Sequence, residues 1–211
     1  MMKDARYQQI GKEWSVTYLP ERPNGFAVFL LSDNGVMTRA SDSDWEAHPE
    51  KERFVNGLLQ RGYTVVVPPL HANHWGSVND YQMVLHMYHS VLKKEILNKQ
   101  VHVLAEGTGA LLALRWFEKN VEQVRSSYFI NPCFNMLAYF RQEQENRWFF
   151  KRFVKEIANV YHEDESNVTD NLIRMISPPT TINHVPPLSI HCDINEKRFP
   201  LHVHSRPFYK S

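Results

Sequence analysis

Residues 101–114 have the sequence VHVLAEGTGALLAL. The first part, through Leu104, is apolar and β-branched, which is typical of a buried strand. Two glycines, Gly107 and Gly109, follow, and an apolar run then begins whose residues suit a helix. A strand that turns into a helix over so few residues needs small side chains at the turn. The stretch therefore predicts a tight strand-to-helix connection inside an α/β protein.

Strand and helix patterns alternate on both sides of this turn. Continuous apolar runs between turn residues predict buried strands, and apolar residues at i, i+3 and i+4 predict helices. Such alternation predicts right-handed βαβ crossovers and a mainly parallel sheet with helices on both faces. Strands are expected at 14–19 (an edge strand), 26–31, 63–67, 101–104, 127–130 and 188–191, with a further candidate at 201–203. Helices are expected at 49–61, 78–97, 110–119, 137–158 and 169–176.

Length and charge limit the classes of function. A chain of 211 residues with 43% hydrophobic residues fits one α/β domain over residues 1–211. Lys and Arg number 24 against 23 Asp and Glu, so no strong field attracts nucleic acid or an anionic membrane. We expect no nucleic acid and no membrane as partner, because no apolar run reaches the ~18 residues that span a bilayer. The only two cysteines, Cys133 and Cys192, fit a reducing compartment, and we expect a cytoplasmic protein.

The turn at residues 105–109 has the layout of a nucleophile elbow. On this turn, and on the order of the strands around it, the chain resembles the α/β-hydrolase family over about residues 14–133. The resemblance implies an α/β-hydrolase-like fold with a helical cap-like insertion at about 134–177 and a shortened C-terminal end. Aromatic residues are frequent between Tyr139 and Tyr161, where they would form a lid, a partner-binding patch or ordinary packing on the sheet.

The elbow departs from the family pattern at its tip. The family's catalysis needs a side chain with oxygen or sulfur there, and Gly107 has no side chain. The loop that supplies an oxyanion-hole amide reads His-Gly in the family but Ser32-Asp33 here, followed by Asn34. An anionic Asp33 would oppose the negative charge that develops on an oxyanion. These departures predict a degenerate member of the family.

The remaining catalytic positions are weakly matched. By position, the family's acid corresponds to Asp193, with Glu196 as a second choice, and its histidine to His204 or His202. About ten residues separate acid from histidine, which leaves no room for the helix that normally lies between the last two strands. Asp193 and His204 are thus only weak catalytic candidates.

The first hypothesis is a catalytically degenerate protein that binds a small molecule or a protein partner at the old pocket. Asn34, Glu106, Gly107 and Thr108 are the predicted binding residues, because the amides of Asn34 and Thr108 should face a shared cavity at the carboxyl edge of the sheet. The second hypothesis is an ester or acyl hydrolase with a displaced nucleophile. Its candidate nucleophiles are Ser32, Thr108 and Cys133, with His204 as base.

A metal-dependent enzyme is the third hypothesis. His71 and His74 follow one strand and Asp193 follows another, so all three would lie at the carboxyl edge of the sheet. Their spacing matches no dedicated metal motif, and we predict no metal. The pair Gly107-x-Gly109 lacks the third glycine of a dinucleotide fingerprint, so no cofactor is predicted.

Overall fold

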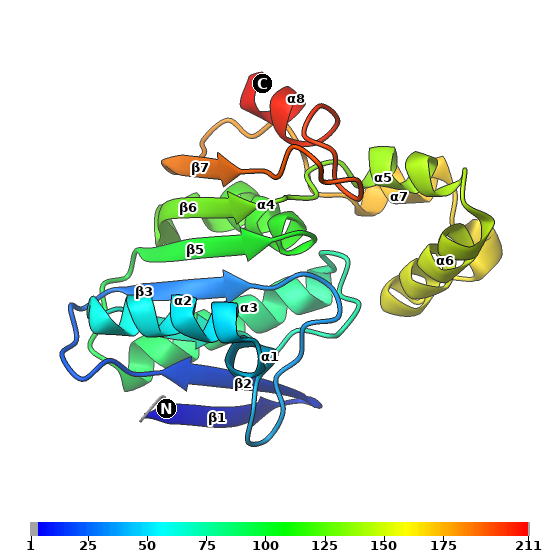
Figure 1. Ribbon diagram of the computed structural model, residues 1–211. Coiled ribbons are helices and arrows are strands. Elements are labelled where there is room, and N and C mark those ends of the chain that lie inside the picture. The colour runs from blue at the N-terminus through cyan, green and yellow to red at the C-terminus, as the bar shows by residue number, and fades with distance from the viewer. Residues whose placement is uncertain (1–3, 211) are drawn as a thin grey trace.

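The computed structural model describes residues 4–210, which form a seven-stranded sheet in the order β1-β2-β4-β3-β5-β6-β7 (Figure 1). Strands β3 to β7 are parallel, and β1 and β2 run antiparallel to their neighbours. The mainly parallel sheet predicted from the sequence is confirmed. The strands are β1 (Ala5–Ile10), β2 (Glu13–Tyr18), β3 (Ala27–Leu31), β4 (Thr64–Val67), β5 (Val101–Glu106), β6 (Val124–Ile130) and β7 (Leu188–His191).

Strand β2 is not the edge strand that its alternating pattern predicted. It lies between β1 and β4, with Val16 opposite Val67. The outer strand is β1, whose side chains are half-buried or exposed. Its polar sequence, with Arg6 and two glutamines, gives only a weak period-2 apolar signal, so the sequence did not reveal it.

Helices cover both faces of the sheet, as expected (Figure 1). One core packs sheet residues such as Phe29 against Val84 and Trp116, from helices α3 and α4. A second core joins Val28 to Trp45 and Val55, from α1 and α2 on the opposite face. The helices are α1 (Asp44–Ala47), α2 (Pro49–Gln60), α3 (Val78–Lys94), α4 (Gly109–Asn120), α5 (Met136–Glu143), α6 (Arg147–Tyr161), α7 (Asp170–Ile176) and α8 (Ser205–Lys210).

The insertion at 134–177 is helical, but the single helix expected at 137–158 is two helices. Helix α5 ends at Glu143, and α6 begins after Asn146, whose side-chain oxygen accepts a hydrogen bond from the amide of Trp148. Such an N-cap satisfies an amide that the first turn leaves free. Phe153 packs edge-on against Trp75 at 4.6 Å between ring centroids, whereas Trp148 remains 85% exposed.

The C-terminal end lacks the strand proposed at 201–203. Residues 201–204 form a turn, in which the amide of His204 donates to the carbonyl of Pro200, and α8 follows. Pro200 favours this turn over an extended strand. Strand β7 is therefore the edge of the sheet on that side. No helix within residues 4–210 is long and apolar enough to cross a bilayer.

Candidate functional site

The site is built around the turn between β5 and α4. Gly107 lies at its tip with φ of +53°, a left-handed conformation that glycine adopts at little cost, and the predicted tight strand-to-helix turn is confirmed. Its amide donates to the carbonyl of Ile130 at 3.0 Å, and its carbonyl accepts from the amide of Cys133 at 2.9 Å. Two residues later, a β-carbon on Gly109 would lie 2.0 Å from the carbonyl oxygen of Leu31. Close backbone packing thus requires glycine at position 109, and the positive φ favours glycine at position 107.

The carboxylate of Asp33 fills the space next to Gly107. A β-carbon added at position 107 would lie 2.3 Å from the Cγ of Asp33 and 2.5 Å from its Oδ1. Real β-carbons do not come so close to other atoms. Any side chain at the tip of the elbow would therefore displace Asp33.

Four donors hold this carboxylate. Its Oδ1 accepts from the amide of Thr108 at 2.9 Å, from the Thr108 hydroxyl at 2.7 Å and from the amide of Asn34 at 2.8 Å. Its Oδ2 accepts from Nη1 of Arg198 at 2.5 Å. The amides of Asn34 and Thr108 converge on one point, but that point is the carboxylate of Asp33 rather than the open cavity that we expected them to face. Free N–H groups at the start of α4 make this a favourable place for an anion.

Arg198 was not singled out from the sequence. It lies 165 residues from Asp33, in a segment between β7 and α8 that carries no regular structure. Its guanidinium lies 4.6 Å from the ring centroid of Phe199 and 5.9 Å from that of Tyr139. Burial lowers the pKa of Arg198, but the charge of Asp33 and the contact with Tyr139 outweigh it and raise that pKa. Arg198 thus stays a cation at the mouth of the site.

The two weak catalytic candidates do not meet. His204 is buried, and its Nδ1 accepts a hydrogen bond from the amide of Asn135 at 3.2 Å. The Nδ1 atom therefore carries no proton, and the Nε2–H is left without a partner among the described residues. Burial, and to a lesser degree the charge of His202, lower the pKa of His204 to about 4. The carboxylate of Asp193 accepts from the amide of Asn195 in a turn after β7.

Solved structures with the same arrangement of strands and helices are hydrolases. The acylaminoacyl peptidase of Pyrococcus horikoshii superposes with a TM-score of 0.69 at 14% identity, over 98% of this chain and 34% of that one. The Pyrococcus furiosus esterase Pf2001 superposes with a TM-score of 0.64 at 14% identity, over 98% of this chain and 76% of the esterase. A putative esterase from Staphylococcus aureus superposes with a TM-score of 0.64 at 15% identity, over 98% of this chain and 69% of that one. This chain has the α/β-hydrolase fold.

The likeness is one of fold. This chain spans about a third of the length of the acylaminoacyl peptidases that it resembles. No protein-family model and no curated protein matches its sequence. In the α/β-hydrolase fold, Gly107 occupies the elbow tip, and the loop with Asp33 follows the first parallel strand, as the sequence resemblance implied.

The candidates for a displaced nucleophile are all engaged or buried. The hydroxyl oxygen of Ser32 accepts from Nε1 of Trp45 at 2.8 Å. Thr108 is fully buried, and its hydroxyl donates to Asp33. Burial is the main cause that raises the pKa of the Cys133 thiol, which keeps the sulfur protonated and a poor nucleophile. In the part of the chain that the structure covers, none of the three hydrogen-bonds to His204.

Among the described residues, His71, His74 and Asp193 do not form a group of metal ligands. His71 donates from its backbone amide to Asp80 and contacts the same carboxylate through Nδ1 at 2.9 Å. His74 uses both ring nitrogens, since Nε2 contacts the carbonyl of Ser32 and Nδ1 accepts from the amide of Gly76. Burial lowers the pKa of His74. Among the described residues, no three His, Cys, Asp or Glu side chains gather as metal ligands.

The other two predicted binding residues flank the elbow. Glu106 pairs with Lys51 at 2.8 Å between Nζ and Oε2, and both side chains remain partly exposed. The side-chain oxygen of Asn34 lies 3.1 Å from the Thr108 hydroxyl oxygen, while its Nδ2 has no partner among the described residues. The carboxyl edge of the sheet is therefore polar, and Asp33 stands at its centre.

Proposed function

We propose that this chain is a catalytically inactive protein with the α/β-hydrolase fold that binds a small molecule or a protein partner. One observation carries the proposal: the Asp33 carboxylate occupies the place where an elbow side chain would lie, since its Cγ is 2.3 Å from the position that a β-carbon on residue 107 would take. Covalent catalysis needs a nucleophile at that point, and the space for one is filled.

The electrostatics of the site agree with this proposal. An oxyanion hole must offer free N–H donors to the charge that develops in the transition state. The amide of Thr108, which follows the elbow tip, is bound to Asp33, and so is the amide of Asn34. A second negative charge next to this carboxylate would be repelled. Stabilisation of an acyl-transfer intermediate is thus lost together with the nucleophile.

Binding at the old pocket is supported by the groups that surround Asp33. The side chains of Asp33 and Arg198 are 19% and 34% exposed, so the ion pair stands at the surface of the site. Arg198 also faces the rings of Tyr139 and Phe199. A ligand with a neutral hydrogen-bond acceptor next to an apolar group suits this arrangement, because the acceptor can bind the Arg198 guanidinium and the apolar group can lie against the two rings. Two thiols without a disulfide fit the cytoplasm as the compartment.

A fluorophosphonate label and an assay with p-nitrophenyl esters test the loss of catalysis. We expect no adduct by mass spectrometry and no saturable turnover by the full chain, with an active serine esterase in parallel as positive control. An adduct on Ser32 or Thr108, or turnover that disappears in His204→Ala, would favour a hydrolase with a displaced nucleophile and overturn the proposal.

A further inference from the structure

The outer edge of β7 has unpaired backbone groups. The amide of Ser127 donates to the carbonyl of Pro187, and the amide of Asn131 donates to that of His191, both at 2.9 Å. Because backbone groups alternate sides along a strand, positions 187, 189 and 191 face β6. Leu188 and Ile190 therefore turn their N–H and C=O groups outward. Within residues 4–210 no strand lies beyond them and no hydrogen bond reaches them.

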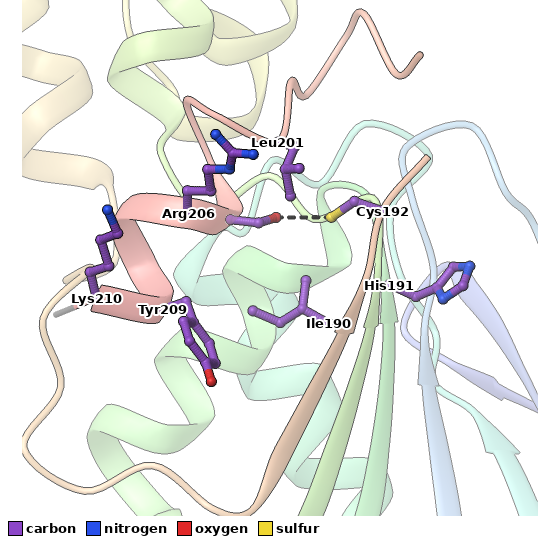
Figure 2. A pocket seen from close by; sticks show the side chains of 8 residues that line it. Ile190, His191, Cys192, Leu201, Arg206, Tyr209 and Lys210 are labelled. Atoms are coloured by element: carbon purple, nitrogen blue, oxygen red, sulfur yellow. Dashed lines mark hydrogen bonds between the residues drawn. The ribbon is translucent and has the colours of Figure 1, made fainter. Parts of the chain in front are cut away.

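A groove of about 520 Å³ runs between this edge and α8. Figure 2 shows Ile190 and Tyr209 directed into the space between strand and helix, while His191 points to the other side of β7. At one end, the Cys192 sulfur and the Ser205 hydroxyl lie 3.1 Å apart. The groove is lined by Ile190, His191, Cys192, Leu201, Ser205, Arg206, Tyr209 and Lys210.

The charge of the groove has one sign. Helix α8 contributes Arg206 and Lys210, both exposed, and among residues 4–210 no acidic side chain lines the groove. Tyr209 between them is 80% exposed. An occupant with carboxylates is favoured by these cations, and an apolar residue of the occupant would lie against Ile190.

We propose that the groove between β7 and α8 binds an extended, acidic peptide segment, which adds to the sheet as a strand beside β7. Leu188 and Ile190 would exchange hydrogen bonds with the peptide backbone, while Arg206 and Lys210 pair with its acidic side chains. Strand addition in a groove between an edge strand and a helix is a mode in which the main chain gives affinity and side-chain pockets give specificity. The inference does not depend on whether the elbow is inactive.

A second copy of this chain fits the edge less well. Pairing two β7 strands about a two-fold axis would place two copies of α8, each with Arg206 and Lys210, in one interface whose groove residues offer no acidic partner. Like charges at such a contact oppose association. An acidic peptide meets no such repulsion.

Fluorescence anisotropy with a panel of labelled decapeptides tests the proposal. The peptides alternate Glu or Thr with varied apolar residues, and we expect saturable binding of at least one by the full chain. Methylation of alternate amides in that peptide should abolish binding, because it removes the donors that pair with Leu188 and Ile190. Arg206→Glu and Lys210→Glu should each weaken binding at least five-fold. The matched control is Lys12→Glu, an exposed charge reversal at the opposite edge of the sheet, which should leave peptide binding unchanged.

Alkylation of Cys192 by N-ethylmaleimide gives a second readout, since this partly buried thiol lines the groove and Cys133 is fully buried. A bound peptide should slow it. The proposal fails if no peptide binds at millimolar concentration. It also fails if amide methylation of the peptide, or charge reversal on α8, leaves the affinity unchanged. It also fails if the protein proves to be a dimer that Ile190→Pro dissociates, since the occupant would then be a second copy.

Discussion

The substitution Asp33→Ala tests the arrangement around the elbow most directly. It removes the acceptor of four hydrogen bonds, but some of the four donors have a second acceptor within reach. The amide of Asn34 also lies 2.9 Å from the Thr108 hydroxyl oxygen, and that hydroxyl can turn to the side chain of Asn34. The Thr108 amide has no second acceptor. A buried donor left unpaired costs about 1–3 kcal/mol, and the partly exposed pair with Arg198 contributes about 1 kcal/mol or less.

We therefore expect Asp33→Ala to lower the free energy of unfolding by about 1–4 kcal/mol. For a chain of this size that corresponds to a loss of roughly 2–15 °C in Tm, measured by circular dichroism. Asp33→Asn keeps an acceptor for the Thr108 amide but loses the charge and the acceptor for Arg198, so its loss should be about 1 kcal/mol. The pair of variants separates the hydrogen bond from the ion pair.

Acetate provides the decisive arm of this experiment. In Asp33→Ala the vacated site keeps the Thr108 amide and Arg198, so an added carboxylate should bind there and restore stability. At a concentration ten times its Kd, acetate would raise the free energy of unfolding of Asp33→Ala by about 1.4 kcal/mol. Sodium chloride at equal ionic strength, wild-type protein and Asp33→Asn are the controls. If Asp33→Ala melts like wild type, or if chloride and acetate act alike, the carboxylate of Asp33 is not bound in the way described.

Three further predictions concern the same region. In the wild type, Gly107→Ala should lower the free energy of unfolding by several kcal/mol, because its β-carbon meets Asp33. In an Asp33→Ala background only the positive φ remains unfavourable, and the loss should be about 1 kcal/mol. A double-mutant cycle of thermal melts would show the difference. The folded-state pKa of His204, about 4, lies below its unfolded value of ~6.5, so its stabilising contribution is complete above pH 6.5 and about 3 kcal/mol is lost as pH falls to 4. His204→Gln should flatten the Tm profile over that window, and an unchanged profile would exclude this histidine as the cause. Iodoacetamide should label Cys192 in the native protein and Cys133 only after denaturation, as peptide mass spectrometry would report.

The features that the sequence predicted correctly depend on local signals. The turn at Gly107 was found because two glycines stand between an apolar strand and an apolar helix, and each of these patterns extends over neighbouring residues only. The buried parallel strands carry the same kind of signal. The polar strand β1 carries only a weak signal of this kind, because Ala5 and Tyr7 alone share an apolar face and its place in the sheet comes mainly from pairing with β2.

The centre of the site depends on contacts that sequence spacing cannot show. Asp33 meets Thr108 across 75 residues and Arg198 across 165. The sequence suggested only that an anionic Asp33 would harm an oxyanion hole. Sequence spacing also did not show the partners of the two histidines in the metal hypothesis, since His71 contacts Asp80 and His74 contacts the carbonyl of Ser32, 42 residues away.

Gly107 and Asp33 are best understood as one feature of the structure. A side chain at position 107 and a carboxylate at position 33 compete for the same volume, so the chain can hold one of them but not both. With glycine at the elbow, the N–H groups at the start of α4 still favour an anion, and Asp33 supplies it from within the chain. Gly107→Ser alone therefore cannot rebuild a hydrolase, because the new hydroxyl would meet Asp33 before it met any substrate. If the elbow is inactive, as we propose, the aspartate beside it accounts for this as much as the glycine at its tip.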